Sequence, residues 1–70
     1  MIEAFQPEPG RCYLVDSITF SNGFSFDKSI VSFTDDFLIR YTNQMKIMDW
    51  YALRTVNRIR GVKPIKKYNL

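Results

Sequence analysis

The sequence predicts a mainly β fold, a small antiparallel meander, because two turn signals separate three extended runs. Asn22-Gly23 is a strong hairpin signal, since both residues tolerate the positive φ angles that a type I′ turn requires. Thr34-Asp35-Asp36 has the composition of a second turn. Around these turns, aromatic and β-branched residues alternate with polar ones, the period of half-buried strands. Together they predict at least three consecutive strands.

The expected elements follow in chain order. Residues 1–10 contain Pro7, Pro9 and Gly10, which predicts an extended N-terminal arm. A polar interruption within the second extended run predicts a bulge or a sharp bend of the kind that small barrels need to close. The predicted strands are Cys12–Ser21, Phe24–Phe33 with its interruption at Asp27-Lys28-Ser29, Phe37–Tyr41 and Met45–Trp50.

The segment Asp49–Gly61 has two interpretations. Leu53, Val56 and Ile59 recur at helical spacing between a possible cap, Asp49, and a possible terminating Gly61. Alternatively, Tyr51-Ala52-Leu53 is a tight turn and Arg54–Arg60 is a β-branched strand. The sequence leaves both open.

Composition excludes several classes of function. Seventy residues make one small domain near the lower size limit for a hydrophobic core. One cysteine and no histidine leave no internal disulfide and no zinc ligand set. A nucleophile paired with a base and a glycine-rich phosphate loop are also missing, so we expect a non-enzymatic protein without cofactor or metal. An acidic N-terminal segment and the lack of a long apolar run predict a cytoplasmic protein without a membrane partner.

Charge is distributed unevenly along the chain. Residues 1–53 carry four basic and seven acidic groups, whereas residues 54–70 carry six basic groups and no acidic one. A basic terminal segment suits the phosphates of nucleic acid or another acidic surface. The alternative is that these cations neutralise the acidic remainder, within the chain or between subunits.

Several short motifs, taken together, resemble the Sm-like RNA-binding proteins, including their bacterial host-factor branch. They are Asn22-Gly23, the run Ile30–Phe33, the turn Asp35-Asp36-Phe37, the strand Leu38–Asn43 and then Gln44-Met45. Asp49–Val56 follows at the place of the bacterial branch's Tyr-Lys-His-Ala-Ile-Ser-Thr-Val signature. The resemblance covers about residues 18–60.

This sequence departs from the family at its binding residues. The family's Lys-His pair falls on Trp50 and Tyr51, and a Pro-containing arm replaces its first helix. In a second register, Ile59-Arg60-Gly61 resembles the Arg-Gly of the eukaryotic and archaeal branch, but the family's asparagine then falls on Ile39. Both registers remain open.

Either register implies a strongly bent five-stranded antiparallel barrel, Sm-like or SH3-like, that forms a homo-oligomeric ring by strand-edge pairing and binds single-stranded RNA. The expected organisation is an arm (1–10), a barrel domain (11–63) and a basic tail (64–70). The alternative function is a small protein–protein interaction module, of pleckstrin-like, SH3-like or phage-accessory type. The candidate nucleic-acid contacts, through base stacking and phosphate binding, are Trp50, Tyr51, Arg58, Arg60, Gly61, Lys63, Lys66 and Lys67.

Overall fold

The chain forms antiparallel strands joined by tight turns. The structure, a computed structural model, describes residues 7–65, and no α-helix lies in this range. The predicted mainly β class is therefore confirmed. The elements are β1 (Cys12–Phe20), β2 (Ser25–Phe33), β3 (Phe37–Tyr41), β4 (Ile47–Ala52), the 3-10 turn η1 (Leu53–Thr55), β5 (Val56–Arg60) and β6 (Lys63–Pro64).

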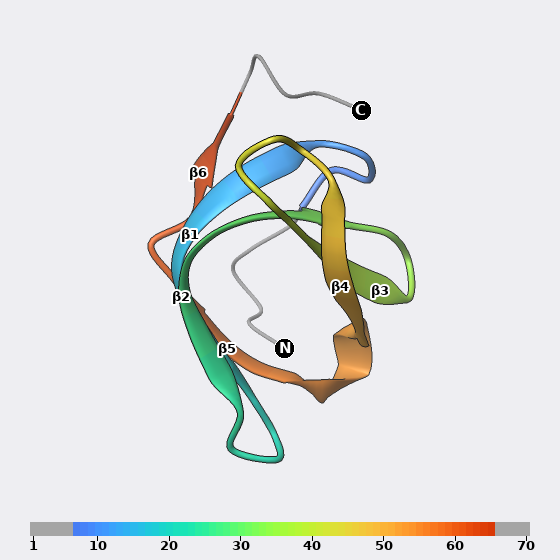
Figure 1. The fold of residues 1–70 in the computed structure, drawn as a ribbon. Coiled ribbons are helices and arrows are strands. Elements are labelled where there is room, and N and C mark those ends of the chain that lie inside the picture. The colour runs from blue at the N-terminus through green and yellow to red at the C-terminus, as the bar shows by residue number, and fades with distance from the viewer. Residues whose placement is uncertain (1–6, 66–70) are drawn as a thin grey trace.

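The strands make one sheet of six strands in the order β4-β3-β2-β1-β5, with the short β6 also paired to β1. The expectation of five strands was one too few, because β6 follows β5 along the same neighbour. Figure 1 shows the sheet curling strongly, with β4 and β5 joined by the short turn η1. Among the described strands β4 and β5 are not paired with each other, so the sheet is open and both are edge strands.

The structure decides between the two interpretations of Asp49–Gly61. The helix is wrong, because β4 extends to Ala52 and η1 leads directly into β5. The turn-and-strand interpretation is close, although both elements begin about two residues later than expected. Three η1 contacts hold the turn: the Leu53 N–H donates to the Asp36 carbonyl, the Thr55 hydroxyl to the Ala52 carbonyl, and the Val56 N–H to the Leu53 carbonyl.

Asn22-Gly23 forms a turn, but not the predicted type I′ turn. Gly23 has φ +91°, whereas Asn22 is not among the residues with positive φ. The Asn22 side chain instead accepts a hydrogen bond from the Phe24 N–H at 3.0 Å, and the Phe20 N–H donates to the Phe24 carbonyl at 2.7 Å. This is a three-residue hairpin loop with glycine in the left-handed position.

A bend crosses the sheet along one line. Asp16 of β1 lies opposite Lys28 of β2, because the pairs Val15–Ser29 and Ser17–Asp27 flank it without a change of register. Asp16 also lies opposite Gly61, because β5 and β6 pair with β1 in one continuous register. Lys28 (φ 50°) and Gly61 (φ 67°) both have left-handed backbones. We call this line of Lys28, Asp16 and Gly61 the crease.

The crease explains which residues face the core. In a regular strand every second residue faces the same side. At the crease this alternation shifts by one residue. In β1 the core-facing residues are odd-numbered up to Val15 and even-numbered from Ile18, and in β2 they are even-numbered at Phe26 and odd-numbered from Val31. The predicted bend at Asp27-Lys28-Ser29 is therefore confirmed, but it extends over three strands and inserts no extra residue. The buried core comprises Tyr13, Val15, Ile18, Phe20, Phe26, Val31, Phe33, Leu38, Val56 and Ile59.

The described part of the N-terminal arm is docked on the sheet. The Gly10 N–H donates to the Phe33 carbonyl at 3.3 Å, and the Glu8 N–H donates to the Tyr13 hydroxyl at 2.9 Å. Residues 1–6 of the arm and 66–70 of the basic tail lie outside the described residues.

Candidate functional site

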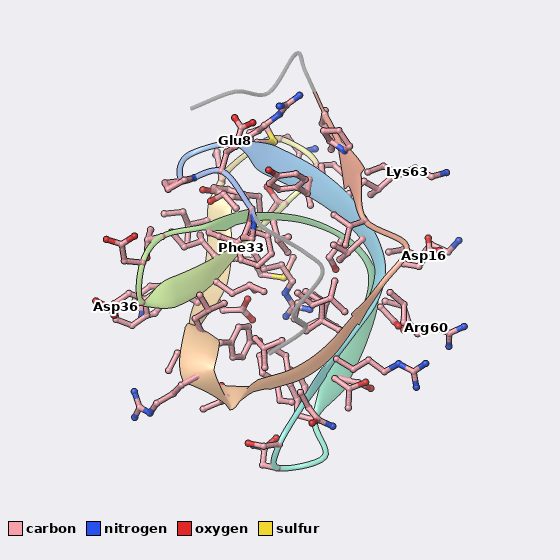
Figure 2. All side chains as sticks on the ribbon, turned by 180° about the vertical axis from the view of Figure 1, so that it is seen from behind. Glu8, Asp16, Phe33, Asp36, Arg60 and Lys63 are labelled. Carbon is pink, nitrogen blue, oxygen red and sulfur yellow. The ribbon has the colours of Figure 1, made fainter. Side chains whose placement is uncertain are left out.

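Three of the candidate cations lie along one sheet edge. Arg58 and Arg60 of β5 and Lys63 of β6 are all exposed, and they alternate with the inward-facing Ile59 and Val62. Within residues 7–65 none of the three has an ion-pair partner. We call these three residues the basic row. Figure 2 shows Arg60 and Lys63 on the same side of the molecule.

The outer face of β1 beside the basic row is mainly polar. Arg60 lies opposite Ser17, and Arg58 lies opposite Thr19, both half-buried. Asp27 lies on the far side of Ser17, two strands from Arg60, or about 10 Å away at the usual strand spacing. Asp16 lies closer, opposite Gly61, and Figure 2 shows it between Arg60 and Lys63. These two carboxylates weaken the positive potential of the row, but within residues 7–65 neither forms an ion pair with it.

Trp50 lies on a different part of the surface, in an apolar groove. Its side chain is 64% exposed on β4, opposite Ile39 of β3. Phe37, Ile39, Ile47 and Trp50 line a hollow of about 220 Å³, which we call the apolar groove. Phe37 and Ile47 are also largely exposed, so this groove lies open to solvent beside the free β4 edge.

An acidic turn adjoins the apolar groove. Asp35, Asp36, Phe37, Leu53 and Arg54 line a second, larger hollow, and Phe37 belongs to both. Thr34 fixes the turn, because its hydroxyl oxygen accepts hydrogen bonds from the Phe37 N–H at 2.9 Å and the Asp36 N–H at 3.3 Å. Figure 2 shows Asp36 on the opposite side of the molecule from Arg60 and Lys63.

Tyr51 points away from Trp50, as neighbours on a strand must. Its ring packs on Phe20, with centroids 4.6 Å apart, and lies about 5.8 Å from Phe24 and 5.9 Å from Phe26. Tyr51 and Trp50 therefore do not make one stacking surface. Tyr51 instead packs with Phe20, Phe24 and Phe26, and we call these four residues the aromatic cluster.

A charged clamp joins β3 and β4 above this aromatic cluster. Arg40 donates two hydrogen bonds to Asp49, Nε to Oδ1 at 3.0 Å and Nη2 to Oδ2 at 2.6 Å. The Tyr51 hydroxyl donates to the same Oδ2 at 2.7 Å, and the Arg40 guanidinium lies 4.2 Å from the centre of the Phe26 ring. The Arg40 hydrogen bonds hold the pKa of Asp49 below its usual value, and burial raises the pKa of Tyr51.

We expect the Arg40–Asp49 clamp to make stability fall in acid. Because the folded-state pKa of Asp49 lies below its ordinary value near 3.8, the clamp contributes fully above that value, and its contribution is lost as the pH falls through the folded-state pKa. Urea unfolding midpoints measured between pH 2 and pH 7 should therefore show a decline below about pH 4.

Two variants test this assignment. Asp49→Asn should be less stable than the parent chain at pH 7 and should lose part of the acid-dependent decline. Tyr51→Phe should retain more of that decline, because it removes only the hydrogen bond from the Tyr51 hydroxyl and leaves both hydrogen bonds between Arg40 and Asp49. An Asp49→Asn variant with an unchanged acid slope would contradict the role of the clamp.

The predicted site residues thus divide into separate groups. Arg58, Arg60 and Lys63 lie together, whereas Trp50 is in the apolar groove and Tyr51 is in the cluster. Gly61 belongs to the crease, where its φ angle and the neighbouring Asp16 side chain explain its identity. Lys66 and Lys67 lie outside the described residues. The groove residues Phe37, Ile39 and Ile47 were missed, although the alternation of Phe37 and Ile39 already places them on one face of a strand.

No protein-family model, curated protein or solved structure matches this chain. In residues 7–65 no three potential metal-ligating side chains gather into one group, and no helix is long and apolar enough to cross a membrane.

Proposed function

We propose that this chain is a non-enzymatic module of Sm-like type that binds single-stranded RNA. The observation that carries the proposal is the basic row, three exposed cations on one edge of the sheet without ion-pair partners among the described residues. Cations in such an arrangement bind phosphates through long-range attraction and release of counterions. The hydroxyl groups of Ser17 and Thr19 in the adjacent strand add hydrogen-bond donors.

The sheet supports the Sm-like part of the proposal. Long, bent strands β1 and β2 and a short turn before β5 agree with the small barrel that the sequence resemblance implies. The open edges of β4 and β5 suit assembly of copies into a ring, since each copy offers one edge to the next. Ring closure would also cover Ile47 and Met48, which are more than half exposed.

Binding to labelled uridine-rich and adenine-rich oligonucleotides tests the proposal. The double variant Arg58→Glu/Arg60→Glu should lose about tenfold or more in affinity at low salt, because two attractive charges become repulsive. Neutralising the same positions, as Arg58→Gln/Arg60→Gln, should reduce the slope of log affinity against log salt by about 1.4, the value for two phosphate contacts on a single strand.

A matched control changes the same charge elsewhere. Lys46→Glu/Arg54→Glu alters two exposed cations outside the basic row and should reduce affinity much less. Equal losses in both charge-reversal variants would mean that overall charge, and not the basic row, governs binding. A chain that is monomeric by light scattering and does not bind RNA at low salt would contradict the whole proposal.

The apolar groove favours the second candidate function, a protein-interaction module. Phe37, Ile47 and Trp50 expose large apolar surfaces side by side, and the adjoining hollow is lined by two carboxylates and one cation, Arg54. Exposed apolar patches of this kind mark protein contacts. Retention of a protein partner after nuclease treatment would support this function, whereas the helix expected for a pleckstrin-like module is not present among the described residues.

A further inference from the structure

We propose that the apolar groove binds the basic tail, residues 66–70 together with Ile65, of a second copy of this chain. The groove is the hollow of Phe37, Ile39, Ile47 and Trp50 on the outer face of β3 and β4. This inference concerns a surface distant from the basic row and does not depend on the proposed RNA binding.

The groove has two neighbouring regions of different chemistry. Its own lining is almost entirely apolar, and Trp50, Ile47 and Phe37 are 64%, 57% and 44% exposed. Phe37 also borders the hollow at the acidic turn, whose lining holds two exposed carboxylates, Asp35 and Asp36, and one exposed cation, Arg54. Neither carboxylate has an ion-pair partner within residues 7–65. A matching ligand therefore carries a large apolar side chain with a cation a few ångströms away.

The tail has this composition. Ile65, Tyr68 and Leu70 supply apolar side chains, and Lys66 and Lys67 lie between the first two. An apolar side chain in the groove would bring an adjacent lysine near the acidic turn, where attraction to a carboxylate at the surface adds to the burial of apolar area. The tail contains no acidic residue that would be repelled there.

The geometry points to a second copy rather than the same chain. Figure 2 shows Lys63, just before the tail, on the opposite side of the molecule from Asp36. The described part measures 30 × 23 × 21 Å, whereas five residues span at most about 17 Å when fully extended. Ile65 lies beside Cys12, and the pairs Cys12–Ser32, Ser32–Ile39 and Ile39–Trp50 put Trp50 four strand spacings, or about 19 Å, away across the sheet. The tail of one molecule therefore reaches at most the near side of its own groove, at Ile39, whereas the tail of a second copy can fill it.

The single tryptophan gives a direct readout, because Trp50 lies in the groove. With excitation selective for tryptophan, the emission of the full chain should move to shorter wavelength as protein concentration rises. A chain ending at Ile65 should not show this shift. Adding a synthetic peptide of residues 62–70 to the shortened chain should restore it, and circular dichroism should show that the shortened chain remains folded.

Matched variants test the two regions separately. A peptide with Lys66→Glu/Lys67→Glu should bind at least tenfold more weakly, and so should the normal peptide to an Asp35→Asn/Asp36→Asn chain. Asp27→Asn, an exposed carboxylate on β2, should leave peptide binding unchanged. Ile47→Asp should abolish the peptide-induced shift while keeping Trp50 as the reporter.

Three results would overturn the inference. An equal concentration-dependent shift in the shortened chain would assign the groove to another part of the second copy. A shift that depends on the tail but not on concentration would assign it to the same molecule. A response of Trp50 to a uridine oligonucleotide but not to the peptide would make the groove part of an RNA interface.

Discussion

Gly61→Ala is expected to destabilise the protein by about 2–4 kcal/mol, combining the cost of a left-handed backbone with that of overpacking. Gly61 has φ +67°, and an added Cβ atom would overlap the Asp16 carboxylate and lie 2.8 Å from the Asp16 Cβ atom. Total stabilities of about 0.05–0.15 kcal/mol per residue imply only about 4–10 kcal/mol for a domain of this size. The measurement is a urea unfolding curve, in which the midpoint should fall sharply.

Two comparisons separate the causes. Gly23→Ala has a similar backbone penalty, at φ +91°, but nothing lies within 4 Å of the added Cβ, so its loss should be smaller. Asp16→Gly removes the overlap, so Gly61→Ala should cost less stability when added to Asp16→Gly than when added to the parent chain. If Gly61→Ala and Gly23→Ala cost the same, close approach at the crease is not important.

Phe33→Ala should cost about 3–5 kcal/mol, the range for deleting a buried aromatic side chain, and should bring the domain to the limit of folding. Phe33 is 1% exposed at the end of β2, and its ring meets Tyr13 edge to face with centroids 5.8 Å apart. Figure 2 shows its position inside the curve of the sheet. Thermal unfolding followed by circular dichroism measures the effect.

Phe37→Ala is the matched control. It makes the same chemical change on the other side of the same turn, but Phe37 is 44% exposed. We expect a loss below about 1 kcal/mol, because little transfer energy and no enclosed cavity are involved. Similar losses for the two variants would mean that the core does not centre on Phe33.

The predictable part of the fold follows from local chemistry. Alternation and turn composition correctly predicted the first three strands, because each strand has one buried face and tight turns require particular residues. The segment Asp49–Gly61 was ambiguous because Leu53, Val56 and Ile59 fit a helix as well as a turn followed by a strand. The contact between the Leu53 N–H and the Asp36 carbonyl decides it, and Asp36 is distant in sequence.

The candidate site was predictable only in part. Arg58 and Arg60 alternate along one strand, so their common face follows from the sequence, whereas Lys63 joins them only because the crease at Gly61 changes the alternation before β6. The separation of Trp50 from Tyr51 also follows from strand geometry, but the partners of each do not. Ile47 joins Trp50 in the groove through the pairing of β3 with β4, and its side of the sheet depends on an irregularity between Arg40 and Tyr41. Sequence spacing gives no sign of that shift.

The crease requires β1 to pair on both sides, and this has a consequence for biosynthesis. β2 follows β1 directly along the chain, but β5 and β6 come from the other end, and the Ile65 N–H donates to the Cys12 carbonyl at 3.0 Å. A ribosome must therefore release residues up to about 65 before β1 has all its partners. Such distant pairing slows folding. The nascent hairpin of β1 and β2 thus has an unpaired edge until β5 and β6 have been synthesised.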